Sequence, residues 1–136
     1  MAPQFMSPSE AAQLIKSGDY VCVGGLVSLA HPEAMTDAVV ARFETTGEPN
    51  GVTIITGAGM FATDRWAREG LTAQHITSHI GLAPNFSKLI HGEKIDAQFL
   101  PFGPITHLIR AIGSKKPGIL TKIGLGTFMD PEFGGG

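Results

Sequence analysis

Short apolar segments alternate with amphipathic ones along most of the chain, and glycine or proline separates them. Apolar and β-branched runs predict five strands, at residues 20–23, 52–56, 75–80, 97–100 and 119–123. Residues at helical spacing predict helices that begin near Ser7, Pro32, Asp64, Pro84 and Pro104. This alternation is typical of an α/β domain with an open, mostly parallel sheet and helices on both faces.

Two of the predicted helices carry clear end signals. Ser7 and Glu10 form an S-x-x-E capping box, with Pro8 at the first helical position. We expect this first helix to end at Gly18 and the second near Gly47. The links between elements are then only a few residues long, as in a parallel sheet with helical crossovers.

Composition adds limits to this picture. The chain has 136 residues, 43% of them hydrophobic and 16% charged, which suits one domain, residues 1–136, with strands buried on both faces. A net charge of −2 gives no electrostatic reason to expect nucleic acid or an anionic membrane as partner. Cys22, the single cysteine, is expected to be a small core residue in a cytoplasmic protein.

Three glycine corners follow predicted strands: Gly24-Gly25, Gly57-Ala58-Gly59 and Gly124-Leu125-Gly126. The carboxyl ends of parallel strands lie on one edge of a sheet, so the three corners are expected to line one crevice. The chain stops soon after the third corner, with no helix to cover the last predicted strand. We therefore expect the domain to be incomplete at its C-terminus.

Other motifs in the chain are candidates for a different kind of site. Residues 57–62 satisfy G-x-G-x-x-A after a strand, but no acidic residue follows about 20 positions on, as a dinucleotide site requires. His75 and His79 lack the companions of a zinc site, so no metal is expected. His31 stands at the mouth of the first corner and Ser28 lacks a nucleophile elbow. Phe102 is interpreted as core packing in preference to the wall of an apolar pocket.

The order of several short motifs resembles the N-terminal part of family I coenzyme A-transferases. In the first signature Gly18, residues 21–25 and Pro32 match, while Leu26 replaces a phenylalanine and Ala30 a glycine. The later matches resemble the propionate-type branch: Gly81-Leu82-Ala83-Pro84, Leu100-Pro101 with Gly103, His107-Leu108 with Arg110-Ala111-Ile112, Pro117-Gly118, and residues 124–128 with Asp130-Pro131.

This resemblance implies an enzyme that moves coenzyme A between a short-chain acyl-CoA and a carboxylate. It implies a glutamate nucleophile, an acyl-glutamyl anhydride and a glutamyl-CoA thioester. The nucleophile belongs to the family's second half, so none of the catalytic residues is expected in this chain. The resemblance therefore implies a second half or partner subunit and an oligomer, with coenzyme A as substrate and no permanently bound cofactor.

The resemblance also implies the residues that would line the substrate pocket. They are Gly24, Gly25, Leu26, Ser28, Phe102, Gly103, Gly124 and Gly126. Relatives usually carry glutamine where Phe102 stands, which implies a bulkier or less polar acyl group, or a degenerate site. Two alternatives stay open: a non-catalytic nucleotide-binding or assembly module that uses residues 57–62, and an acyl-CoA hydrolase on the same fold.

Overall fold

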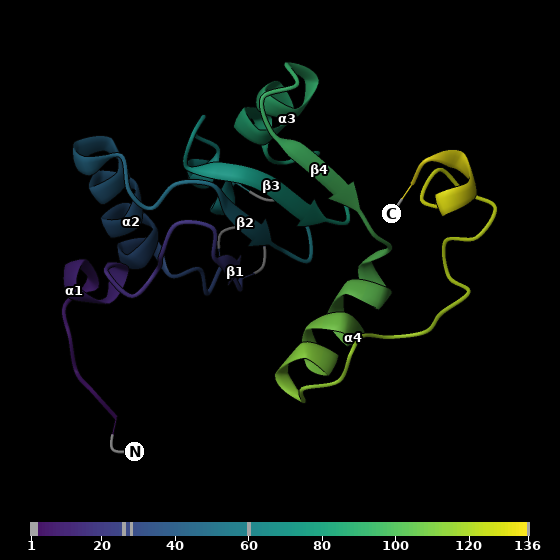
Figure 1. The fold of residues 1–136 in the computed structure, drawn as a ribbon, viewed down its shortest axis with the longest axis horizontal. Coiled ribbons are helices and arrows are strands. Elements are labelled where there is room, and N and C mark those ends of the chain that lie inside the picture. Colours follow the sequence, from purple (N-terminus) through teal and green to yellow (C-terminus); the bar gives the residue numbers. More distant parts are fainter. Residues whose placement is uncertain (1–2, 26, 28, 60, 136) are drawn as a thin grey trace.

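The computed structural model contains one four-stranded parallel sheet with the strand order β1-β2-β3-β4 (Figure 1). It describes residues 3–25, 27, 29–59 and 61–135. The elements are α1 (Pro8–Ala12), β1 (Tyr20–Cys22), α2 (Glu33–Thr46), β2 (Val52–Ile55), the 3₁₀ helix η1 (Thr63–Trp66), β3 (Thr72–Thr77), α3 (Pro84–His91), β4 (Asp96–Phe99), α4 (Phe102–Gly113) and the 3₁₀ helix η2 (Pro131–Phe133). The open parallel α/β sheet expected from the sequence is confirmed.

The register of the strands places one row of side chains under the helical layer. Val21, Ile54, His75 and Ala97 are successive partners across the four strands, and they therefore share a face of the sheet. Ile54 and His75 in the two central strands are fully buried. This face is the one on which α1, α2, η1 and α3 pack.

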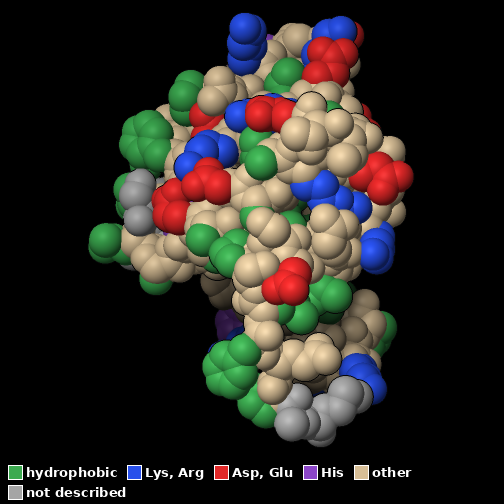
Figure 2. All heavy atoms as spheres, turned by 90° about the vertical axis from the view of Figure 1, so that its left-hand side faces the viewer, with side chains coloured by type: hydrophobic (Ala, Val, Ile, Leu, Met, Phe, Trp, Pro, Cys, Tyr) green, Lys and Arg blue, Asp and Glu red, His purple; other side chains and the backbone are tan. Residues whose placement is uncertain are grey.

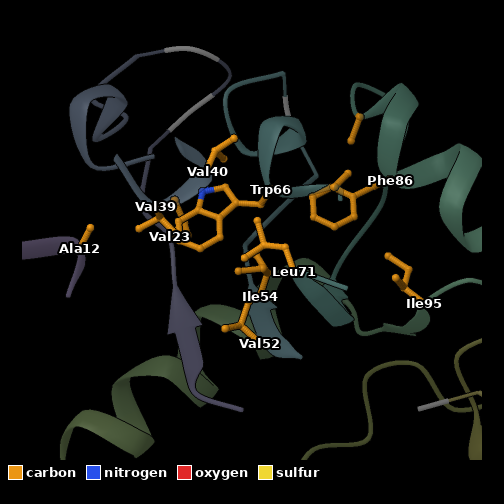
Figure 3. Close-up of a cluster of buried hydrophobic side chains, with 12 residues drawn as sticks. Ala12, Val23, Val39, Val40, Val52, Ile54, Trp66, Leu71, Phe86 and Ile95 are labelled. Atoms are coloured by element: carbon orange, nitrogen blue, oxygen red, sulfur yellow. The ribbon is translucent and has the colours of Figure 1, made fainter. Parts of the chain in front are cut away.

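The hydrophobic core lies between this face and the helices (Figure 3). Val39 and Val40 of α2, Trp66 of η1 and Phe86 of α3 are buried against Ile54 and its neighbours. Helix α4 stands apart from this layer in Figure 1, and its fully buried Ile105 is not part of the cluster.

Cys22 is exposed, which contradicts its expected place in the core. Strand β1 is an edge strand, and Tyr20 and Cys22 point away from the helical layer that covers Val21. Partial burial still raises the pKa of the Cys22 thiol. An apolar run in the sequence does not distinguish an edge strand from a central one.

The start of α1 and the end of α2 agree with the signals in the sequence, whereas the end of α1 does not. In α1, the Ser7 hydroxyl accepts from the Glu10 amide at 3.2 Å and the Glu10 carboxylate accepts from the Ser7 amide at 2.8 Å. The helix ends at Ala12 rather than at Gly18, and the Arg42 guanidinium of α2 donates to the carbonyls of Ala12 and Ile15, each at 2.9 Å, where the helix has ended. Helix α2 ends at Gly47, in the left-handed conformation, as expected.

Strand β3 begins three residues earlier than the apolar pattern predicted. Its buried positions include Thr72, His75 and Thr77, which are polar. The Thr72 hydroxyl donates to the Trp66 carbonyl at 2.7 Å, so this buried polar group has a hydrogen-bond partner. A pattern of hydrophobic residues does not reveal a strand that is buried in this way.

The predicted strand at 119–123 is wrong, because the structure has an irregular arm there (Figure 1). Within the described residues, no strand pairs with this segment, and Leu120 and Ile123 are exposed. The short helix expected near Asp64 is the 3₁₀ turn η1. The helices predicted at Pro84 and at Pro104 correspond to α3 and α4, although α4 begins two residues before Pro104.

Acidic and basic side chains are intermixed on the side of the molecule that α1 and α2 cover (Figure 2). Several of them form ion pairs, such as Arg65 with Asp37 at 2.8 Å and Arg68 with Glu44 at 3.1 Å. These ion pairs join α2 to η1 and to the residue Arg68 that follows it. In the part of the chain that the structure describes, no helix has the length and apolar character needed to cross a membrane.

Candidate functional site

Two of the three glycine corners meet at the carboxyl edge of the sheet. Gly24-Gly25 follow β1 and Gly57-Ala58-Gly59 follow β2, and because these strands are parallel neighbours their corners lie side by side. Together they enclose a cavity of about 20 Å³, enough for about one water-sized group. Its walls also include Val23, Val27, His31, Thr56, Ala62 and Thr63.

The close approach of backbone in this corner explains why Gly25 is a glycine. Its φ of +125° is unfavourable for other residues. A Cβ there would also lie 3.1 Å from the Leu29 carbonyl oxygen and 3.3 Å from the His31 Cα. Leu26 and Ser28, which were expected in the same site, lie outside the described residues.

Phe102 is the residue that connects the second corner to helix α4. A Cβ on Gly57 would lie 3.0 Å from Phe102 Cε2, so the ring rests directly against this glycine. The Phe102 side chain is 53% exposed, which contradicts its interpretation as core packing. It begins α4 directly after Pro101, and this position leaves half of the ring open at the sheet edge. Gly103, also expected in the site, has open space where a side chain would stand.

The third corner lies elsewhere in relation to the first two. Gly124 follows the irregular arm, not a strand, and a Cβ on it would be 3.2 Å from Cγ of Pro101. Gly124 borders an apolar cavity of about 320 Å³ between the arm and α4, with Leu100, Pro104 and Met129 among its walls. The third corner was expected to line the same crevice as the first two. It instead approaches the site only through Pro101, the residue before Phe102.

A carboxylate holds this third corner in shape. Asp130 accepts hydrogen bonds from the Gly126 amide at 2.6 Å and from the Glu132 amide at 3.0 Å. The amide of Gly126, followed by that of Glu132, lowers the pKa of Asp130. The Gly126 amide is thus already occupied by an acceptor from its own loop.

His31 is held at the cavity wall by Thr36 of the helical layer. Its Nε2 lies 2.9 Å from the Thr36 hydroxyl, which also accepts from the Trp66 indole N–H at 3.1 Å. Thr36 is fully buried and Trp66 nearly so. The loop after β1 is therefore tied to the core beneath it.

A buried row of hydrogen-bonded side chains, which the hydrophobic pattern of the sequence does not reveal, supports the second corner. The Thr56 hydroxyl donates to Thr77 Oγ1 at 3.1 Å, and Thr77 donates to the His79 carbonyl at 3.2 Å. Thr56 has only one proton to donate, so His75 Nε2, at 2.9 Å, must be the donor to Thr56. Burial lowers the pKa of His75 to about 4, so the ring is neutral at pH 7. The sequence signals this arrangement only weakly, by placing Thr56 at the end of one β-branched run and His75 and Thr77 in the next.

The two histidines considered for zinc have separate roles. His75 donates to Thr56, while His79 Nδ1 accepts from the Gly81 amide at 3.2 Å. Among the described residues there is no group of three or more histidine, cysteine, aspartate or glutamate side chains that could hold a metal ion.

The dinucleotide alternative does not fit the second corner well. The Gly59 amide already donates to the His79 carbonyl at 2.6 Å. The corner leads into the 3₁₀ turn η1 and not into an α-helix whose first turn would bind a pyrophosphate. Met60 of this motif lies outside the described residues.

No glutamate of the described residues lines either cavity. Glu33, Glu44, Glu48 and Glu69 form ion pairs with Arg65, Arg68, Arg42 and Lys94. Glu10 caps α1, where the amide and the hydroxyl of Ser7 lower its pKa. The site described here is therefore made of backbone, apolar groups, threonine and histidine.

Comparison with known proteins gives consistent matches. Residues 5–134 match the family described as coenzyme A transferase. Caffeate CoA-transferase from Acetobacterium woodii is 38% identical over 98% of this chain, and the alpha subunit of acetoacetyl-CoA:acetate/butyrate CoA transferase from Clostridium acetobutylicum is 28% identical over 85%. The acyl-CoA transferase YdiF from E. coli O157:H7, solved as a thioester complex with CoA, superposes with a TM-score of 0.88 at 30% identity over 93% of this chain.

The lengths of these proteins differ greatly from that of this chain. The chain spans 26% of the A. woodii protein, 27% of the YdiF chain and 52% of the C. acetobutylicum subunit.

Proposed function

Since the chain belongs to the coenzyme A transferase family, we propose that it forms one wall of a site in which coenzyme A passes from an acyl-CoA to a carboxylate. The observation that carries this proposal is the meeting of the Gly24-Gly25 and Gly57 corners with Phe102 at one edge of the sheet. Gly24, Gly25, Leu26, Ser28, Phe102 and Gly103 are the proposed substrate contacts at this edge. Gly124 and Gly126 of the third corner are proposed contacts farther along the substrate, beyond Pro101. Coenzyme A is a substrate in this proposal, and no cofactor is held permanently.

The proposed reaction proceeds through covalent intermediates on a glutamate outside these residues. The glutamate carboxylate attacks the thioester carbonyl, and the coenzyme A thiolate leaves as an acyl-glutamyl anhydride forms. The thiolate then attacks the glutamyl carbonyl of the anhydride, which gives glutamyl-CoA and the first carboxylate. The second carboxylate attacks the glutamyl-CoA carbonyl and expels the coenzyme A thiolate, which gives a second acyl-glutamyl anhydride. The thiolate then attacks the acyl carbonyl of this anhydride, so that the new acyl-CoA forms and the glutamate carboxylate leaves.

The chain's own contribution would be to hold and stabilise the reacting carbonyl. Backbone N–H groups that point at the carbonyl oxygen stabilise the negative charge that develops on this oxygen when the nucleophile attacks the carbonyl carbon. Glycine allows the substrate to approach such amides closely, because no Cβ stands between them. The cavity at Gly24 and Gly57 has room for about one oxygen-sized group.

A further polypeptide segment must supply the nucleophile in this proposal. The ion pairs and cap that occupy Glu10, Glu33, Glu44, Glu48 and Glu69 support this view. The relatives are up to four times as long as this chain, and one of them is named as an alpha subunit. The remaining segment would be either a continuation of the same polypeptide or a separate partner subunit. We also propose the cytoplasmic location that is expected from the sequence.

A fusion protein tests the proposal. This chain is placed in YdiF from E. coli in exchange for the segment that it matches, and transfer of coenzyme A from acetyl-CoA to labelled acetate is measured. We expect exchange by the fusion protein and none by the isolated 136-residue chain. The remaining part of YdiF without this chain is the control and should also be inactive.

Two results would contradict the proposal. Exchange by the isolated chain would show that the nucleophile lies within it. A folded fusion protein that exchanges no coenzyme A with any acid, while intact YdiF does so, would show that these residues do not form the proposed wall.

A further inference from the structure

The loops at the carboxyl edge of the sheet contain no aspartate, glutamate, lysine or arginine. This holds for residues 23–32 after β1, 56–62 after β2, 78–84 after β3 and 100–104 after β4. Charged residues make up 16% of the chain, and the ion pairs lie on helices and their ends. The edge that carries the site is therefore set apart by its chemistry from the helical side shown in Figure 2.

Each of these loops instead exposes a large apolar side chain. They are Val27 and Leu29 after β1, Phe61 after β2, Leu82 after β3 and Phe102 after β4. Phe61 and Phe102 are each more than half exposed. Exposed apolar side chains of this kind mark a place where a partner surface or an apolar ligand group binds.

The corner after β2 connects these loops into one surface. Its Gly57 borders the cavity shared with Gly24 and Gly25 and also meets the Phe102 ring. Its Gly59 donates to the His79 carbonyl of the loop after β3 at 2.6 Å. The apolar edge and the glycine corners are thus parts of the same site.

We infer that the acyl group handled at this site is uncharged and apolar, with a body larger than that of acetyl, and that Phe102 contacts this body. The inference rests on the proposed function and names its substrate class. A second carboxylate on the acyl group would lose its water at this edge without meeting a cation from the described residues, which is unfavourable. An aryl or alkyl body would instead be buried against Phe102 and its apolar neighbours.

The test uses the fusion protein with acetyl-CoA as donor and acetate, trans-cinnamate and succinate as acceptors. We expect kcat/KM for trans-cinnamate to exceed that for succinate by about tenfold or more. Phe102→Gln should lower the ratio of cinnamate to acetate kcat/KM by about fivefold, since the apolar contact is lost while acetate never reaches it. Phe5→Gln is the matched control, because Phe5 is 97% exposed before α1, and it should leave the ratio unchanged.

The alternative is that the remaining part of the enzyme covers these apolar side chains. In that case Phe102→Gln would lower transfer to all three acids alike, and this result would overturn the inference while leaving the proposed function intact. Equal use of succinate and cinnamate would overturn it as well. Absence of transfer to every acid would count against the proposed function instead.

In that last case a binding measurement on this chain decides the inference. Amide chemical shifts are followed by NMR during titration with trans-cinnamamide, a neutral acyl analogue, and with succinamate, a charged one. Saturable shifts at Gly57 and Gly103 with cinnamamide only, weakened by Phe102→Gln, would support the apolar site. No shift with cinnamamide, or an equal response to succinamate, would overturn it.

Discussion

His75 donates a hydrogen bond from Nε2 to the hydroxyl of Thr56, over 2.9 Å and between neighbouring strands. The direction follows from the next two links, in which Thr56 donates to Thr77 and Thr77 donates to the His79 carbonyl. The chain joins the interior of β3 to the corner that borders the cavity. A neutral, buried histidine is thereby part of the support of the candidate site.

The burial of His75 predicts that the protein becomes less stable as the pH falls below 6.5. Burial lowers the pKa of His75 in the folded state to about 4 from an ordinary value of 6.5. Between these values the unfolded chain takes up a proton that the folded chain refuses, so the free energy of unfolding falls by about 2–3 kcal/mol between pH 7 and pH 4.5. Urea denaturation at a series of pH values measures this change.

A matched variant isolates the histidine in that measurement. His75→Gln keeps an N–H donor but does not titrate, so its stability should vary little over the same range. Glu10 and Asp130, whose pKa values the Ser7 and Gly126 amides lower, lose their contribution only at lower pH. Equal pH dependence in the wild type and His75→Gln would show that His75 is not the cause.

Asp64 is predicted to be the most important carboxylate for stability in this chain. It is 4% exposed and accepts from the Phe86 amide at 2.9 Å, the Asn85 amide at 3.0 Å and the Asn85 side chain at 2.8 Å. These bonds cap the start of α3, so Asp64→Ala should lower the free energy of unfolding by about 2–4 kcal/mol. Thermal and urea denaturation check this value.

Asp37→Ala provides the contrast for Asp64. Asp37 pairs with Arg65 on the surface, and its side chain is 65% exposed. Loss of such a pair should change the free energy of unfolding by less than about 1 kcal/mol. Comparable losses in the two variants would mean that the α3 cap does not stabilise the fold as proposed.

The corner glycines are predicted to differ in their tolerance to alanine. A Cβ on Gly59 would lie 2.8 Å from the His79 carbonyl oxygen and 3.2 Å from the Ile80 Cα, both backbone atoms, so Gly59→Ala should cost about 1–3 kcal/mol. Gly103 has nothing within 4 Å of such a Cβ and lies within α4. Gly103→Ala should therefore be neutral or stabilise by up to about 1 kcal/mol. Circular dichroism melting curves of both variants test the difference, and the reverse order would contradict it.

The Thr36 hydroxyl is predicted to fix Trp66 in the core. It accepts from the indole N–H at 3.1 Å and is fully buried, so Thr36→Val leaves this donor unpaired and should cost about 1–3 kcal/mol. Thr36→Ser keeps the hydroxyl and loses only a methyl group, at about 1 kcal/mol. Urea denaturation followed by the fluorescence of Trp66, the single tryptophan, reports both. A serine variant as unstable as the valine variant would rule out the hydrogen bond as the cause.

Local signals in the sequence were sufficient for much of the fold. The capping box at Ser7, the stop at Gly47, and the helices at Pro84 and near Pro104 depend on neighbouring residues, and the structure contains them. The same locality explains the errors. The carbonyls at the end of α1 accept from Arg42, which is distant in sequence, and among the described residues the segment 119–123 has no strand to pair with.

For the site, the sequence by itself determined that glycine corners follow the first two strands and that Phe102 stands where α4 begins. Only the tertiary structure decided which of these meet: Phe102 rests on Gly57, whereas Gly124 reaches only Pro101. It also decided that Cys22 is exposed and that His75 supports Thr56. The physical reason is that turns and caps are set by neighbours in the chain, while burial and long-range hydrogen bonds depend on which elements pack together.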